Sequence, residues 1–96
     1  MSGNVVKAFV TTGAVIKGAK SLTLGVATQT SFWNRPESAI TESMKSGFKA
    51  AVERDTRALP AEADKIVMRE PEHGDDNHYT AVLLDADGNY LESRHY

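Results

Sequence analysis

The sequence predicts an α+β fold in which a curved antiparallel sheet of about five strands packs on one long helix, in the order ββαβββ. One central segment has the apolar spacing of an amphipathic helix. The segments on either side alternate apolar and polar residues as strands do, and turns rich in glycine and proline separate them. Because 96 residues suffice for one modest hydrophobic core, residues 1–96 are expected to form a single domain.

The predicted helix spans residues 34–59. Asn34 followed by Glu37 resembles a capping box, and Pro36 has a backbone torsion suited to a first helical turn. Apolar residues then recur along one side, and Pro60 ends the pattern. The stripe consists of Ala39, Ile40, Met44, Phe48, Ala51 and Val52. A stripe of this kind is typical of a helix that buries one side against a sheet.

Strands are expected on both sides of the helix. Gly13 should kink the first of them, and the sequence Asp85-Ala-Asp-Gly-Asn89 predicts a tight turn between the last two, since Asp-Gly favours a positive φ. Residues 71–77 read as a polar loop. The expected strands are residues 4–12 with their continuation 14–17 beyond the kink at Gly13, then 21–30, 65–69, 78–84 and 90–96.

A single helix covers only one face of such a sheet. The apolar residues expected on the other face are Val5, Phe9, Trp33 and Tyr79. An uncovered apolar face on a small domain favours a homodimer or a ligand-binding surface, and Phe9 and Tyr79 are the candidate ligand-binding residues. The alternative is that these side chains are singly and partly exposed, with Trp33 closing the core beside the helix.

Charge is divided along the chain. The net charge is −2, but residues 1–52 carry +4 and residues 53–96 carry −6. Acidic residues are densest at Glu70, Glu72, Asp75 and Asp76, which with Trp33 are the candidate contacts to a basic protein partner. The alternative is a solvated acidic loop. Basic residues are few and scattered, so direct binding to nucleic acid is disfavoured.

Composition excludes several classes of protein. An apolar fraction of 41% with 25% charged residues is typical of a globular domain. The chain has no cysteine, which excludes disulfides, thiolate metal sites and a cysteine nucleophile. No secretory signal and no apolar run of bilayer length is evident, so a cytoplasmic protein without membrane contact is expected.

The segment from Lys20 onward resembles one module of the vicinal-oxygen-chelate superfamily, which includes glyoxalases and bleomycin-resistance proteins. The resemblance lies in the element order, in Arg69-Glu-Pro71 and above all in the closing hairpin, His78-Tyr-Thr-Ala-Val-Leu-Leu-Asp-Ala-Asp-Gly-Asn-Tyr-Leu-Glu92. It implies a cup completed by dimerisation and, in metal-dependent members, a divalent cation bound by Glu92. The usual histidine on the opening strand has no counterpart in residues 21–26.

Other polar residues give no established pattern. His73, Asp75, Asp76 and His78 match no known ligand spacing, so a solvated loop is favoured over a metal site. No Gly-x-Ser-x-Gly motif presents a nucleophile.

We therefore expect a non-enzymatic binding module without a cofactor, which docks on a protein partner or holds a small molecule. It is similar in size and composition to the small inhibitors encoded by phages and mobile elements. The alternatives are a chelate-superfamily enzyme completed by dimerisation and a structural subunit.

Overall fold

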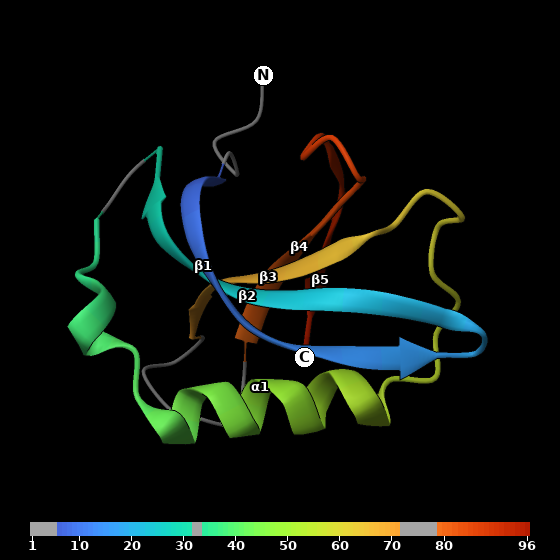
Figure 1. Cartoon of the computed structure of the whole chain (residues 1–96), viewed down its shortest axis with the longest axis horizontal. Helices are drawn as coiled ribbons and strands as arrows, with labels where there is room; N and C mark the ends of the chain where they lie inside the picture. The colour runs from blue at the N-terminus through green and yellow to red at the C-terminus, as the bar shows by residue number, and fades with distance from the viewer. Residues whose placement is uncertain (1–5, 32–33, 72–78) are drawn as a thin grey trace.

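The computed structural model describes residues 6–31, 34–71 and 79–96 and has an α+β fold, with one α-helix lying against a five-stranded sheet (Figure 1). The strands lie in the sheet in the order in which they follow along the chain, so β1 and β5 are its two edges. The strands are β1 (Val6–Lys17), β2 (Lys20–Thr30), β3 (Lys65–Pro71), β4 (Tyr79–Leu84) and β5 (Tyr90–His95). The predicted α+β class and the sheet of five strands are confirmed.

The sheet is mixed, and the prediction of a wholly antiparallel sheet is wrong. β2 and β3 pair in parallel, from Thr23 opposite Lys65 to Val26 opposite Met68, whereas the other three pairs are antiparallel. The cause is the long connection between β2 and β3. Because it includes the helix, it can return the chain to the same end of the sheet, as parallel neighbours require.

The helix is shorter than the sequence predicts. α1 (Glu42–Arg54) has 13 residues and follows a separate 3₁₀ turn, η1 (Glu37–Ala39), so the expectation of one long helix is wrong. Its N-cap is Thr41 rather than Asn34. The Thr41 hydroxyl accepts a hydrogen bond from the backbone N–H of Met44 at 3.1 Å, which satisfies a donor that the first helical turn leaves free. No helix in the described part of the chain is long and apolar enough to cross a membrane.

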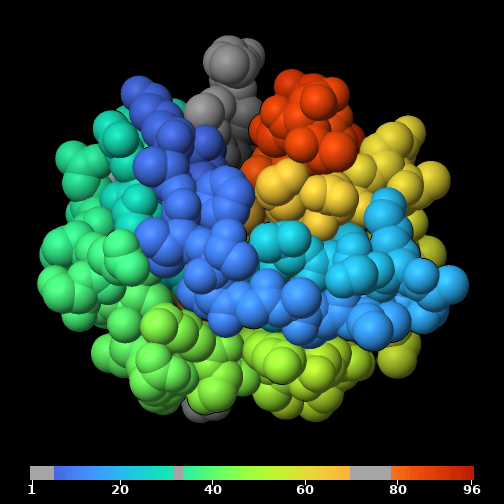
Figure 2. Space-filling view, in the orientation of Figure 1, coloured from blue at the N-terminus to red at the C-terminus, as the bar shows by residue number. Residues whose placement is uncertain are grey.

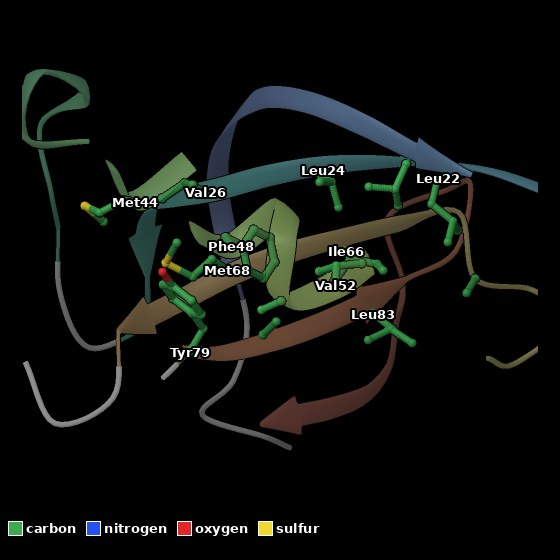
Figure 3. Packing of buried hydrophobic residues seen from close by; sticks show 14 of the residues in the cluster. Leu22, Leu24, Val26, Met44, Phe48, Val52, Ile66, Met68, Tyr79 and Leu83 are labelled. Carbon is green, nitrogen blue, oxygen red and sulfur yellow. The ribbon is translucent and has the colours of Figure 1, made fainter. Parts of the chain in front are cut away.

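The main core lies between α1 and the sheet. Met44, Phe48, Ala51 and Val52 are buried on one side of α1, which confirms the apolar stripe within the helix. Figure 3 shows Met44, Phe48 and Val52 of the helix meeting residues of the sheet. The sheet contributes Leu22, Leu24, Val26, Ile66, Met68 and Leu83, all at most 1% exposed.

Tyr79 belongs to this core, so its predicted place on the uncovered face is wrong. Its side chain is 1% exposed, and its ring meets that of Phe48 edge to face with 5.7 Å between centroids (Figure 3). Successive residues of a strand point to opposite faces. β4 begins with Tyr79 directed toward the helix, and Ala81 and Leu83 follow in the same core.

The face of the sheet away from α1 is covered at its centre, which also corrects the expectation of an open apolar face. Ala27, Val67 and Val82 are fully buried there, and Val6 and Phe9 pack against them. β1 has three register shifts against β2 before Gly13. Such irregularities bend a strand, and Figure 1 shows the first half of β1 curving away from the line of its second half.

Gly25 on β2 leaves room for the Phe9 ring. A Cβ at Gly25 would lie 2.6 Å from Phe9 Cδ2 and 2.9 Å from the carbonyl oxygen of Val10. Gly25→Ala should therefore destabilise the fold by roughly 1–3 kcal/mol, measured by urea unfolding. Gly13→Ala is the matched control, because a Cβ there meets nothing within 4 Å. Equal stabilities of the two variants would contradict this packing.

The predicted turn between β4 and β5 is confirmed. Gly88 has a φ of 86°, and the side-chain Oδ1 of Asp85 accepts hydrogen bonds from the backbone N–H groups of Asp87 and Asn89. A glycine adopts this positive φ without steric cost, and the aspartate supplies the acceptor that orders the turn.

Candidate functional site at the free edge of β1

The edge strand β1 is long, and it is uncharged between Lys7 and Lys17. Residues 8–16 contain no charged side chain, and many of them are β-branched or aromatic, as strand formation favours. Ala8, Thr11, Ala14 and Ile16 are exposed, and Ile16 is 74% exposed. Figure 2 shows the atoms of β1 running uncovered across one side of the molecule. Among the described residues, no other strand pairs with the outer side of β1, so its main-chain groups are accessible along the uncharged residues 8–16, between Lys7 and Lys17.

The opposite edge of the sheet differs in length and charge. β5 has six residues, half as many as β1, and carries Glu92, Arg94 and His95. Short, charged edge strands resist pairing with other chains, whereas long uncharged ones invite it. Of the two edges, β1 is thus the better candidate for contact with another polypeptide.

Lys17, at the end of β1, points into its own molecule. Its ammonium donates hydrogen bonds to the carbonyl oxygens of Val52 at 2.9 Å, of Glu53 at 3.4 Å and of Asp55. These carbonyl groups lie at the C-terminal end of α1. There the last turn leaves acceptors without partners within the helix, and the helix dipole favours a cation. Lys17 therefore fastens β1 to the helix and does not project from the edge of the sheet.

A cluster of ionic side chains joins the end of α1 to β5. Asp55 Oδ2 accepts from Arg94 Nη1 at 3.1 Å, and both side chains are 7% exposed. Arg94 also donates through Nε to Glu92 Oε2 at 2.6 Å and through Nη2 to the carbonyl oxygen of Ala58. Arg57 donates to Asp55 Oδ1 through Nε at 2.8 Å. All of these donors and acceptors serve internal contacts.

The pKa values in this cluster follow from those contacts. Burial alone would raise the pKa of Asp55, but hydrogen bonds from Arg57 and Arg94 outweigh it and lower the pKa to about 2. Burial, assisted by the charge of Asp55, raises the pKa of Tyr96 to about 12. A perturbed pKa can mark a functional site. Here the geometry assigns the charges a structural role, namely fastening residues 55–58 to β5.

The Asp55 shift predicts how stability depends on pH. Because the pKa of Asp55 is about 2 in the folded protein, against 3.8 for an unperturbed aspartate, the ionised carboxylate stabilises the fold above about pH 4. That contribution, about 2 kcal/mol, should be lost as the pH falls toward 2. Urea unfolding from pH 6 to pH 2 measures it, with Asp55→Asn as the control. If the unfolding free energy of Asp55→Asn fell between pH 6 and pH 2 as much as that of the original protein, this assignment would be contradicted.

The structure places few of the predicted partner contacts. Trp33, Glu72, Asp75 and Asp76 lie outside the described residues, as do His73, His78 and Val5. Glu70 lies in β3 opposite Thr80. The role predicted for this acidic segment stays a prediction.

The two predicted ligand-binding residues are not brought together. Tyr79 lies in the core between helix and sheet, whereas Phe9 packs against the buried cluster on the other face. A shared ligand surface formed by their side chains is therefore not present in this fold.

Glu92, the metal ligand implied by the family resemblance, is paired with Arg94. Its side chain is 39% exposed, so a cation could approach it only in competition with the guanidinium. No group of three or more histidine, aspartate or glutamate side chains suited to hold a metal occurs among the described residues.

Sequence reasoning missed the β1 edge and the Asp55–Arg94 cluster. The uncharged run of residues 8–16 was a readable signal, but only the strand order shows that it forms an edge. For the ionic cluster no such signal exists, because Asp55 and Arg94 are 39 residues apart and match no motif.

No family model, no curated protein sequence and no solved structure matches this chain.

Proposed function

We propose that this chain is a non-enzymatic protein-binding module whose working surface is the free edge of β1. The observation that carries the proposal is the combination of edge position, length and absence of charge over residues 8–16. Its exposed side chains add an apolar contact, since Ile16 is 74% exposed beside the small residue Ala14. Strands with these properties are templates for pairing with another chain.

Binding would add one strand to the sheet. An extended protein segment beside β1 accepts and donates main-chain hydrogen bonds, which supply affinity with little dependence on sequence. Ala14 and Ile16 supply selectivity, because they lie on the face away from Val15, whose side chain is buried toward the helix. A module of this kind acts by pairing with an extended segment of its partner and so blocking that segment, as a small inhibitor would.

Selection from a library of random peptides about ten residues long tests this function. Peptides selected on the immobilised protein should have uncharged centres and should bind the Ile16→Lys variant at least about tenfold more weakly, because a lysine places an unpaired charge beside the added strand. Ala86→Lys is the matched control, since Ala86 is exposed in the turn between β4 and β5. Peptides that bind both variants as tightly as the original protein would contradict an edge site.

A further inference from the structure

Within this edge, the second half of β1 is the part whose register is regular enough for a continuous ladder with another strand. From Gly13 opposite Leu24 to Lys17 opposite Lys20 the register against β2 runs without interruption. The three register shifts all lie before Gly13. Bulges bend an edge and so obstruct continuous pairing. An added strand therefore has five consecutive residues, Gly13 to Lys17, on which to form a ladder.

This regular half lacks the charge that usually protects an edge. Lysine side chains on edge strands prevent unwanted pairing by projecting into the space that a second strand would occupy. The one charged residue here, Lys17, has its ammonium bound to the carbonyl oxygens at the end of α1. Ala14 and Ile16, in contrast, are exposed and apolar. The edge is thus open to a strand that is itself uncharged.

We infer that the strand which occupies this edge is β1 of a second copy of the chain, paired antiparallel about Val15. This step rests on the proposed function, from which it takes the binding surface. In a two-fold pair centred on Val15, Ile16 of each copy lies opposite Ala14 of the other. Each exposed Ile16 then packs over a small residue, so the same contact is made twice and both apolar side chains are covered.

The same register keeps the lysines apart. Lys17 of one copy lies opposite Gly13 of the other, where a Cβ would meet nothing within 4 Å, so its side chain has room. The two Lys17 residues are four positions apart along the paired strands, which is roughly 13 Å. That distance exceeds the Debye length at physiological salt, about 8 Å, so their repulsion is weak. Self-pairing in this register thus covers the exposed Ile16 side chains and keeps the two Lys17 charges apart.

Sedimentation velocity tests the inference. As the concentration rises from about 10 µM to about 1 mM, the mass should rise from that of one chain, 10.4 kDa, toward twice that value, because a five-residue ladder gives modest affinity. Ala14→Lys and Ile16→Lys should stay at the mass of one chain, with melting temperatures close to that of the original protein because both residues are exposed. Ala86→Lys should dimerise like the original protein.

Two results would overturn self-pairing: a single-chain mass at every concentration, or dimerisation of the two β1 variants equal to that of the original protein. If the original protein is monomeric and the selected peptides still bind in an Ile16-dependent way, the edge site stands. Only the assignment of a second copy as its occupant is then wrong. If it is monomeric and no peptide binds at β1, the proposed function falls as well.

Discussion

Replacing Phe48 with alanine is expected to lower the free energy of unfolding by about 3–5 kcal/mol. Phe48 is fully buried at the centre of α1, and its ring packs edge to face on Tyr79 and on Tyr96, with centroids 5.7 and 6.1 Å away. The loss combines the transfer of a buried aromatic group with the cavity that it leaves, since helix and sheet can close the gap only in part.

Urea unfolding measures the loss, with Lys49→Ala as the control. Lys49 is the next residue of α1 and is exposed, so its replacement should change stability by no more than about 0.5 kcal/mol. A loss below about 1 kcal/mol for Phe48→Ala would mean that this side of α1 does not face the core.

Arg94→Ala is expected to cost about 3 kcal/mol. Removing the guanidinium leaves the Asp55 carboxylate, 7% exposed, without one of its cationic partners, and leaves the Ala58 carbonyl without its donor. An uncompensated buried charge costs far more than an exposed ion pair contributes. The cost should be measured at pH 7, where Asp55 is ionised.

Arg57→Ala provides the comparison for Arg94. Arg57 also pairs with Asp55, but its side chain is 54% exposed, so its loss should cost no more than about 1 kcal/mol. A double-mutant cycle of Arg94→Ala with Asp55→Ala isolates the coupling between the two groups. Equal costs for the two arginines, or no coupling in the cycle, would show that the cluster does not fasten β5 to the end of the helix.

Much of the fold could be predicted from local pattern, and the errors have physical causes. The spacing of Met44, Phe48 and Val52 correctly indicated the buried side of α1, and Asp85 with Gly88 correctly indicated the last turn. The helix was overextended because Ile40 continues the apolar stripe although it precedes the N-cap, Thr41. Burial alone cannot distinguish a helical residue from an extended one beside it.

The sheet was misjudged because strand direction depends on connections. A strand, a helix and a strand in succession, as in β2, α1 and β3, commonly form a parallel pair. The alternation within each strand says nothing about that direction. Alternation also gave Tyr79 the wrong face, since it shows which residues share a side but not which side meets the helix.

The candidate site could be predicted only in part. The absence of charge over residues 8–16 is visible in the sequence, but their position at an edge depends on the order of all five strands. The direction of the Lys17 side chain, toward its own molecule, depends on where α1 ends, 35 to 38 residues further along the chain. Long-range contacts of this kind leave no trace in local spacing.

Amide hydrogen exchange along β1 is the most direct test of an edge that binds another strand. Exchange in dilute protein, at about 1 µM, is compared with exchange in two other samples. One is saturated with a selected peptide, and the other is the protein alone at about 1 mM, where it is self-paired. We predict that exchange slows at least about tenfold within residues 13–17 and is unchanged in β5, because new ladder hydrogen bonds form only at the β1 edge. Unchanged exchange in β1, or protection confined to β5, would contradict the account.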